Sequence, residues 1–519
     1  MSRAPHRPTV LPSAGRGLLT KPNLIFWVAL LAIGNYALLA LWYTGLDNFF
    51  SYAEPNIASI SWTMLQGKPV YHSLTSAEQY SMVYGPYLFV INGLFFSLLG
   101  PGILSFKLAE ALFAIASVLS VVWAVRCISD IRTGIVAGGF LALTYFSFWP
   151  FSTFIARSDA LILGLVGMAL VAAHGRRKSL SVITAAIALG VCVGIKPHAA
   201  MYFLPIWVIL QQRFGWAAFF LAGFGAIPIA FAPFVVFPNI SLPNYILWLN
   251  LVAEHGLDFP LFVGNMRNML ILQILPAVML LSILPRPMAI LKQHRMLVGT
   301  FALSMAIVMP VASVTGAGKF HLVPFSIVMV YWFAAIFHEH YSSQAAITAR
   351  IRGFALKQMI IFGLLTLMVL NAFPVNRRMI KLMNHGGRFN GAVDDIREIL
   401  TAYPEKSIGM GDGELKSYEL SYFRPLLVFA GHPYLIDPVS VMVRVKAGYG
   451  VGAQTVSAIR NCDLDIWLIP KGDVPFAIDS IYGGSRQLYP KQFRQAFLKN
   501  YRARAKTEYF DLWFCKSHN

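Results

Sequence analysis

Long apolar segments separated by short polar loops run from residue 24 to residue 375 of the chain. A membrane span needs roughly 20 consecutive apolar residues. The pattern therefore predicts about eleven spans, at residues 24–46, 103–126, 133–150, 160–174, 180–196, 198–211, 214–237, 269–284, 296–313, 320–337 and 358–375. Segment 198–211 is shorter than a typical span, and Pro197 favours a break before it.

Basic loops set the predicted orientation of these spans. Residues 1–23 form a basic tail, and cytoplasmic loops are enriched in Lys and Arg, so we expect the N-terminus in the cytoplasm. Segment 83–100 must then lie in the interface, because a crossing there would put Arg126, Arg132 and the basic loop 176–178 outside. The result is a multi-pass domain of the plasma (inner) membrane at 24–375, with outer loops 47–102 and 238–268.

The composition of the chain changes after residue 375. Acidic residues become frequent between 376 and 519, and short apolar runs such as DIWLIP and DLWFC alternate with helical stretches such as AVDDIREILTAY. This alternation predicts a small extracytoplasmic α/β domain. Cys462 and Cys515 lie beside the predicted strands, and an oxidising exterior would permit a disulfide between them.

The overall composition excludes several classes of protein. Of 519 residues, 57% are hydrophobic and 13% charged, whereas a soluble domain has roughly 45–50% apolar and 25% charged residues. The net charge of +19 fits basic loops facing anionic lipid, because no block of basic and aromatic residues resembles a nucleic-acid platform. The four cysteines show no CxxC or His-paired spacing, which argues against a structural zinc or redox site.

The stretch 51–72, SYAEPNIASISWTMLQGKPVYH, follows the first span directly. Glu54 precedes an apolar helical face, which predicts an amphipathic helix at the membrane surface with this acid held over the bilayer. The alternative is a surface acid that caps a short helix.

Other ionisable residues also gather at the predicted outer ends of the spans. A carboxylate there can deprotonate an acceptor hydroxyl, and Lys and His can stabilise the charge that grows on a phosphate leaving group. The pattern favours transfer of a group from a lipid-linked phosphate. The outer ionisable residues are Glu54, Lys68, His72, Arg157, Asp159, Lys196, His198, Glu254, His255, Asp258, Lys319 and His321.

Residues 54–71 carry a resemblance to a known superfamily. The run E-P-N-x-A-x-x-x-W-x-M-L-x-G-K-P-V-Y is similar to the first outer loop of GT-C membrane glycosyltransferases. It looks most like the branch of dolichyl-phosphate-mannose–protein mannosyltransferases and bacterial polyprenyl-phosphate-sugar transferases. The segment VYGPYLF resembles the interfacial helix of that branch, residues 157–159 its second acidic loop, and residues 318–324 a later Gly-Lys-x-His-x-x-Pro-like loop.

This resemblance implies an all-α polytopic membrane domain of the GT-C type and an inverting transferase with its site on the non-cytoplasmic face. The donor would be a polyprenyl-phosphate-linked sugar, and the acceptor a lipid, polysaccharide or protein of the envelope. Glu54 and Asp159 are the candidate catalytic acids. The candidates for binding the donor phosphate are Arg157, Lys196, His198, Lys319 and His321, and those for binding substrate are Lys68, Tyr71, His72, Tyr84, Glu254 and His255.

The chain departs from this family pattern at one position. Many members have two adjacent acids in the first loop, whereas here Ala53 precedes Glu54. Glu54 would therefore act alone or with Asp159. The mannosyltransferase-like branch works without a metal, so no cofactor is expected, although a divalent cation is not excluded.

Less specific interpretations of these residues stay open. Asp159 could be a solvated acid paired with Arg157, and Lys or His near helix ends commonly extend toward the interface. Two other functions compete with the transferase: a polysaccharide ligase that uses a diphosphate-linked donor, and a lipid or sugar transporter. A transporter would place ionisable residues near mid-membrane, within two related halves, and no internal repeat is visible.

Overall fold

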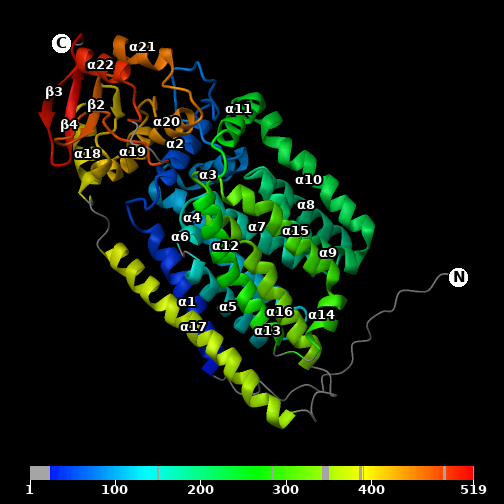
Figure 1. Ribbon diagram of the computed structural model, residues 1–519. Helices are drawn as coiled ribbons and strands as arrows, with labels where there is room; N and C mark the ends of the chain where they lie inside the picture. Colours follow the sequence, from blue (N-terminus) through cyan, green and yellow to red (C-terminus); the bar gives the residue numbers. More distant parts are fainter. Residues whose placement is uncertain are drawn as a thin grey trace.

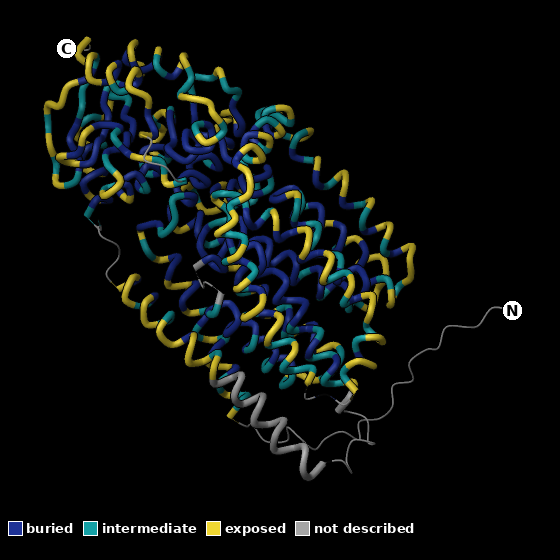
Figure 2. The backbone as a smooth tube through the Cα atoms, viewed as in Figure 1, coloured by how far each residue is buried: buried dark blue, intermediate teal, exposed yellow. Residues whose placement is uncertain are grey.

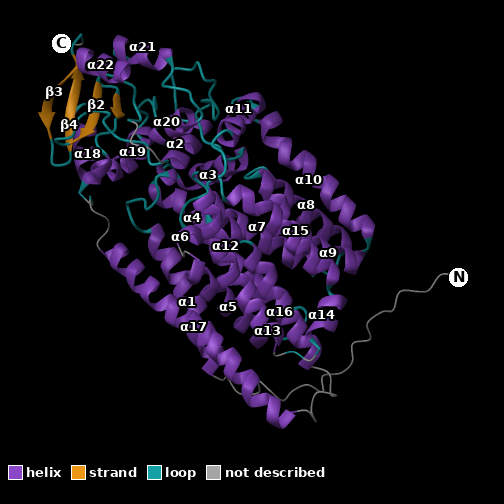
Figure 3. Cartoon of the chain, viewed as in Figure 1, coloured by secondary structure: helices purple, strands orange, loops and turns teal. Residues whose placement is uncertain are grey.

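The computed structural model describes residues 24–148, 151–282, 284, 286–341, 350–384, 389, 391–482 and 487–517. Helices form the larger part of the molecule, and a small sheet with its own helices caps one end (Figures 1 and 3). This arrangement confirms the predicted all-α membrane domain followed by an α/β domain. The basic tail predicted at residues 1–23 lies outside the described residues.

Helices occupy every predicted span. Among the described residues, six helical segments are long and apolar enough to cross a membrane: 24–44, 103–126, 216–236, 259–282, 295–312 and 319–339. The eleven-span count itself stays a prediction. The helices of this part are α1 (Leu24–Thr44), α4 (Ile103–Arg126), α5 (Ile131–Phe148), α6 (Phe151–Phe154), α7 (Ser158–Ala173), α8 (Lys178–Val193), α9 (Ala200–Phe214), α10 (Trp216–Val236), α12 (Phe259–Met269), η2 (Leu270–Ile274), α13 (Leu275–Ser282), α14 (Pro287–Gln293), α15 (Arg295–Ala312), α16 (Phe325–Tyr341) and α17 (Arg350–Asn384).

Small residues let the central helices pack closely. A Cβ atom on Gly139 of α5 would lie 2.4 Å from the backbone of Ala29 in α1, and one on Gly164 of α7 would lie 2.6 Å from the ring of Phe113 in α4. Such positions allow helix backbones to approach where lipid supplies no hydrophobic driving force. Buried residues accordingly lie inside the bundle, and exposed apolar residues lie along outer helices such as α10 (Figure 2).

Short helices form a layer between the bundle and the α/β domain. They are α2 (Ala53–Leu65), α3 (Pro86–Leu99), α11 (Leu242–Ala253), η1 (Pro197–Ala199) and η3 (Lys319–Leu322). Helix α3 has 14 residues, fewer than a span requires, so it fits the interfacial placement predicted for 83–100. Helix α2 differs from the prediction of a surface helix, because nearly all its residues are buried between α3 and the α/β domain.

The α/β domain contains a four-stranded sheet in the order β1-β2-β4-β3, in which β1 and β2 are parallel and the other pairs antiparallel. The runs DIWLIP and DLWFC are strands β2 and β4, as predicted, and AVDDIREILTAY is helix α18. Helix α17 continues beyond the predicted domain boundary at residue 375. The elements are α18 (Ala392–Ala402), β1 (Ile408–Met410), η5 (Leu415–Phe423), α19 (Arg424–Phe429), α20 (Pro438–Lys446), α21 (Ala453–Asn461), β2 (Ile466–Pro470), α22 (Lys491–Asn500), β3 (Tyr501–Lys506) and β4 (Phe510–Cys515).

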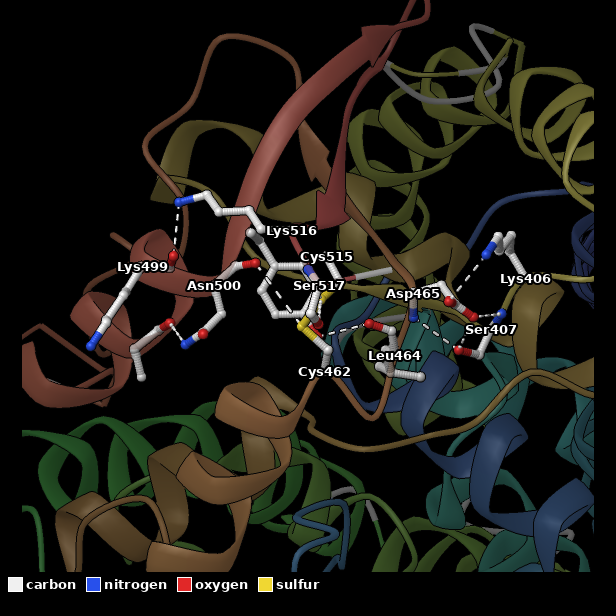
Figure 4. The surroundings of a disulfide bond; sticks show 12 residues. Lys406, Ser407, Cys462, Leu464, Asp465, Lys499, Asn500, Cys515, Lys516 and Ser517 are labelled. Carbon is white, nitrogen blue, oxygen red and sulfur yellow. Dashed lines mark hydrogen bonds and ion pairs between the residues drawn. A yellow bond between two sulfur atoms is a disulfide. The ribbon is translucent and has the colours of Figure 1, made fainter. Parts of the chain in front are cut away.

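A disulfide joins Cys462 to Cys515, which confirms the pairing that the sequence left open (Figure 4). It ties the residue after α21 to the last residue of β4, with 5.9 Å between the Cα atoms. Nearby, the hydroxyl of Tyr501 donates to the carbonyl of Leu464, which further fixes the start of β2.

Candidate active site

A cavity of about 500 Å³ lies where the helical bundle meets the α/β domain. Three distant parts of the chain form its wall: the segments that precede α2 and α7, loops from the second half of the bundle, and the α/β domain. The lining residues are Tyr52, Arg157, Asp258, Thr315, Gly316, Ala317, Phe320, Ile481 and Tyr482. Its size falls within the range of roughly 300–1,000 Å³ that is typical of ligand sites.

A compact charge cluster supports the cavity wall at Arg157. Lys196 Nζ lies 2.6 Å from Asp159 Oδ1, and Arg157 Nε lies 3.6 Å from Asp159 Oδ2. Asp159 and Lys196 are buried, and Asp159 occupies the first turn of α7. Two cations face one carboxylate, so the cluster carries one positive charge in excess, which suits an anionic group in the cavity.

Both cations of this cluster make cation–π contacts with aromatic rings. The Arg157 guanidinium lies 4.6 Å from the ring centre of Phe320, and Lys196 Nζ lies 5.4 Å from the rings of Phe320 and Tyr84. Burial alone would lower the pKa of Arg157, but Tyr84 and Asp159 outweigh it and raise that pKa. Arg157 therefore remains a fixed positive charge, and its Nε has no hydrogen-bond partner.

The two candidate histidines form a pair. His198 Nε2 and His321 Nδ1 lie 2.9 Å apart, and the hydroxyl of Tyr202 donates to the carbonyl of His321. The pair joins η1 to η3 next to the charged cluster. Lys319 is half-buried beside Phe320.

Glu54 is enclosed rather than exposed. Its Oε1 accepts hydrogen bonds from the hydroxyl of Tyr43 and from the backbone N–H of Ala156 at 3.0 Å. Its Oε2 accepts from the backbone N–H groups of Phe50 at 2.8 Å and Ser51 at 2.7 Å. No surface of Glu54 is exposed, yet Ala156 directly precedes Arg157 of the cavity wall.

A buried lysine fixes the segment between α1 and α2. Lys107 Nζ of α4 donates to the carbonyls of Tyr43, Leu46 and Asn48 at 3.3, 2.7 and 2.5 Å. Burial raises the pKa of Glu54 above its usual value, whereas the charge of Lys107 and the backbone donors oppose that rise. Sequence analysis did not identify Lys107, which lies inside an apolar segment; a lone lysine there was the available signal.

The segment 238–268, which was predicted to be an outer loop, reaches the cavity through Asp258. The Oδ1 atom of Asp258 accepts from the N–H of Leu261 at 3.0 Å and so caps α12, while the residue also lines the cavity. His255 is buried, with Nε2 3.1 Å from the carbonyl of Val443 in the α/β domain. Glu254 is exposed at the end of α11 and is absent from the cavity wall.

The remaining substrate candidates lie away from the cavity. Tyr71 is buried and donates to the carbonyl of Tyr84 at 2.7 Å. The ring of His72 packs on Tyr80, and burial lowers the pKa of His72 to about 4. Lys68 is exposed in the turn after α2. These residues shape the outer loop rather than the cavity wall.

Several wall residues were missed by sequence analysis. Tyr52 precedes Glu54 by two positions, and Phe320 lies between Lys319 and His321, so both lay beside residues that the analysis identified. Ile481 and Tyr482 come from the α/β domain, and no local pattern marks them. Within the described residues, no group of three or more His, Cys, Asp or Glu side chains is placed to hold a metal ion.

Comparisons with known proteins agree with this architecture. Residues 84–265 match the family model of Glycosyltransferase family 87. The chain is also similar to ArnT from Cupriavidus metallidurans bound to undecaprenyl phosphate, with a TM-score of 0.57 and 13% identity over 95% of this chain and 98% of that one. The fold is GT-C. The predicted relation to the GT-C superfamily is thus confirmed.

Two further solved structures show weaker similarity to the chain. ArnT from the same organism in the apo state gives a TM-score of 0.48 at 13% identity, over 94% of this chain and 97% of that one. The Archaeoglobus fulgidus oligosaccharyltransferase in the apo form gives 0.43 at 12% identity, over 87% and 70% of the two chains. No curated protein matches the chain. Together, the family model and the GT-C fold support a membrane glycosyltransferase.

Proposed function

We propose that this GT-C protein transfers a sugar from a polyprenyl-phosphate donor to an acceptor hydroxyl of the cell envelope, with inversion at the anomeric carbon. One observation carries the proposal: Arg157, from a cluster with one positive charge in excess, lines a 500 Å³ cavity next to aromatic rings. The similar structure of ArnT contains bound undecaprenyl phosphate, which supports a lipid-phosphate ligand in this fold.

The reaction explains why cations belong in the cavity. The acceptor oxygen forms a bond to the anomeric carbon while the bond from that carbon to the phosphate oxygen breaks. The electron pair of the broken bond stays on the phosphate, which changes from a singly charged diester to a doubly charged monoester. Arg157, with Lys196 behind it, favours the transition state because the phosphate gains charge only as the bond lengthens.

Glu54 is our candidate for the base that receives the acceptor proton. Burial raises the pKa of Glu54, which strengthens it as a base, whereas Asp159 is already paired with Lys196. The carboxylate lies behind the cavity wall, between the backbones that lead to Tyr52 and Arg157. Because Glu54 is fully enclosed, it can act only if acceptor binding opens the wall between its carboxylate and the cavity. Asp258, which already lines the cavity, is the alternative base.

We place the reaction on the non-cytoplasmic face of the plasma (inner) membrane, with the N-terminus in the cytoplasm. The distribution of Lys and Arg in the loops and the disulfide of the α/β domain both support this orientation. The sugar is a hexose or a pentose, and no metal takes part. The acceptor is a lipid, polysaccharide or protein.

The proposal is tested by transfer from a panel of labelled polyprenyl-phosphate sugars into envelope extracts, using purified protein. We expect the wild type to transfer one sugar and Arg157→Gln to lose about 100-fold in kcat/KM, because a preorganised charge at the leaving group is removed. The matched control is Arg213→Gln, at the opposite end of α9 from the histidine pair.

Three outcomes would contradict the proposal. Transfer only from diphosphate-linked oligosaccharides would identify a ligase instead. Movement of labelled lipid across vesicles without transfer would identify a transporter. Equal transfer by the wild type and Arg157→Gln would remove the proposed role of the cavity.

A further inference from the structure

Helix α2 is held from two sides. On one side Glu54 binds Tyr43, the backbone before α2 and the N–H of Ala156. On the other side Asn56 Nδ2 donates to Asp437 Oδ1 of the α/β domain at 2.8 Å, and the hydroxyl of Tyr434 donates to Asn56 Oδ1 at 3.0 Å. Both Glu54 and Asn56 are fully buried, so each contact is shielded from water.

The anchor in the α/β domain is a buried ion-pair network. Asp437 Oδ2 lies 2.9 Å from Arg424, and Arg424 also lies 3.4 Å from Asp412. Burial raises the pKa of Asp437 to about 6, with Arg424 opposing the rise, so the carboxylate is ionised at neutral pH. Tyr489 donates to Asp412 at 2.5 Å and closes the network inside the domain.

The carboxylate of Asp437 has little freedom to move. Besides Asn56 and Arg424, it accepts from the N–H groups of Val439 and Ser440 in the first turn of helix α20, and it shares the single hydroxyl proton of Tyr434 with Asn56 Oδ1. The Asp437 carboxylate is held in place, because moving it would break several buried hydrogen bonds at once. The fold of the α/β domain therefore fixes where the Asn56 side chain lies.

Helix α2 also connects Asn56 to the cavity wall. Glu54 lies two residues before Asn56, and its carboxylate holds the N–H of Ala156 at 3.0 Å. The next residue, Arg157, presents the guanidinium that lines the cavity. Buried hydrogen bonds thus link Asp437 to Asn56 at one end, and Glu54 to the backbone N–H of Ala156, the residue before Arg157, at the other, with α2 between them.

We propose that the α/β domain positions Arg157 for the donor phosphate through Asp437, Asn56 and α2, and so forms an integral part of the transfer site rather than a separate module that captures acceptor. The proposal rests on the proposed function, in which Arg157 binds that phosphate. Asn56 and Asp437 are positioning residues, since they act through Glu54 and Ala156.

The test compares full-length variants that lose contacts between α2 and the α/β domain with a control variant that loses a contact elsewhere. Asn56→Ala removes both hydrogen bonds between α2 and the α/β domain. Tyr434→Phe removes one hydroxyl but keeps the ring, which stacks on Tyr80 with centres 4.4 Å apart, and serves if Asn56→Ala does not fold. The control is Thr455→Val, which removes a bond from the α/β domain to the carbonyl of Ala77, outside α2.

Two measurements are made on each variant: amide hydrogen exchange in peptides covering residues 50–51 and 156, and binding of undecaprenyl phosphate. We expect Asn56→Ala to speed exchange at Ala156 and to weaken binding by roughly 10- to 100-fold, because small misplacements of a binding group are costly. Tyr434→Phe should show the same changes to a smaller degree. Thr455→Val should match the wild type.

The two proposals fail in distinguishable ways. If Asn56→Ala and Tyr434→Phe both showed the wild-type exchange rate at Ala156, the proposed positioning of Arg157 through α2 would be wrong, whatever the protein binds. Faster exchange with unchanged phosphate binding would also overturn it, because Arg157 would not depend on α2. A wild type that neither binds undecaprenyl phosphate nor transfers sugar would overturn the proposed function, while the exchange data would still report on the mechanical link.

Discussion

Glu54 and Asp159 are both buried acids near the cavity, but their partners differ in charge. Four neutral donors surround Glu54: one tyrosine hydroxyl and three backbone N–H groups. Asp159 instead lies 2.6 Å from Lys196 and 3.6 Å from Arg157. Neutral donors stabilise a carboxylate without cancelling its charge, whereas a cation at contact distance cancels it.

This difference assigns separate tasks to the two acids. A carboxylate that keeps its charge in a buried place is suited to receive a proton. A carboxylate paired with two cations is suited to hold those cations where a phosphate needs them. In our proposal, Glu54 therefore serves the acceptor and Asp159 serves the donor.

Removing the charge of Glu54 should have the largest effect. Glu54→Gln should lower kcat by about 10²–10⁴-fold, the usual contribution of a general base. Donor KM should rise less, as the loop of Ala156 loosens. Steady-state transfer kinetics measure both values, with Glu54→Asp as the variant that keeps the charge.

A folding control is essential for this variant, because the glutamine amide would face backbone N–H donors and cost about 1–3 kcal/mol. A folded Glu54→Gln protein with kcat within tenfold of the wild type would move the base role to Asp258. In that case Asp258→Asn should show the large loss instead.

The pH profile sharpens the comparison further. The base must be ionised, and burial raises the pKa of Glu54 above its ordinary value of 4.5. The kcat/KM of the wild type should therefore fall about tenfold per pH unit below a midpoint that lies above 4.5. A profile whose acid limb lies at or below that ordinary value would contradict the assignment of Glu54.

Asp159→Asn should act on stability more than on chemistry. The change leaves Lys196 as a buried charge without its carboxylate, which costs about 3–5 kcal/mol. Donor KM should not rise, since the cluster then carries two positive charges. Thermal unfolding in detergent measures the loss, and adding Lys196→Met should restore much of it. If Asp159→Asn lowered kcat as much as Glu54→Gln does, the assignment of separate tasks to the two acids would be wrong.

Chelation should have the smallest effect. Lys196 already neutralises Asp159, and both carboxylate oxygens of Glu54 accept hydrogen bonds, so neither acid needs a metal. Transfer should be unchanged in EDTA. Activity lost in EDTA and restored by Mg²⁺ or Mn²⁺ would show that one of these acids binds a cation during the reaction.

Much of the fold and part of the site follow from sequence. Apolar segments predicted the helices because only helices satisfy the backbone within lipid. Asp159, Lys196, His198 and His321 could be grouped because they occur at the ends of spans, and the structure brings them together. Positions at helix ends thus carry information about neighbours that lie far apart in the chain.

The burial of α2 and the contribution of Tyr482 could not be derived in this way. Both result from docking of the α/β domain, a contact between residues more than 300 positions apart. One local signal existed for α2: after Glu54 the helix has no charged residue, which is unusual for a helix with a face in water. Tyr482 had no comparable signal.

The three-part cavity wall has a consequence for biogenesis. Spans enter the membrane in the order of synthesis, but Ile481 and Tyr482 complete the wall only after the α/β domain has folded. That domain is closed by a disulfide whose second cysteine, Cys515, follows them in the chain. A partly synthesised chain therefore has the charges of Arg157 and Lys196 but no finished cavity, so folding of the α/β domain completes the wall last.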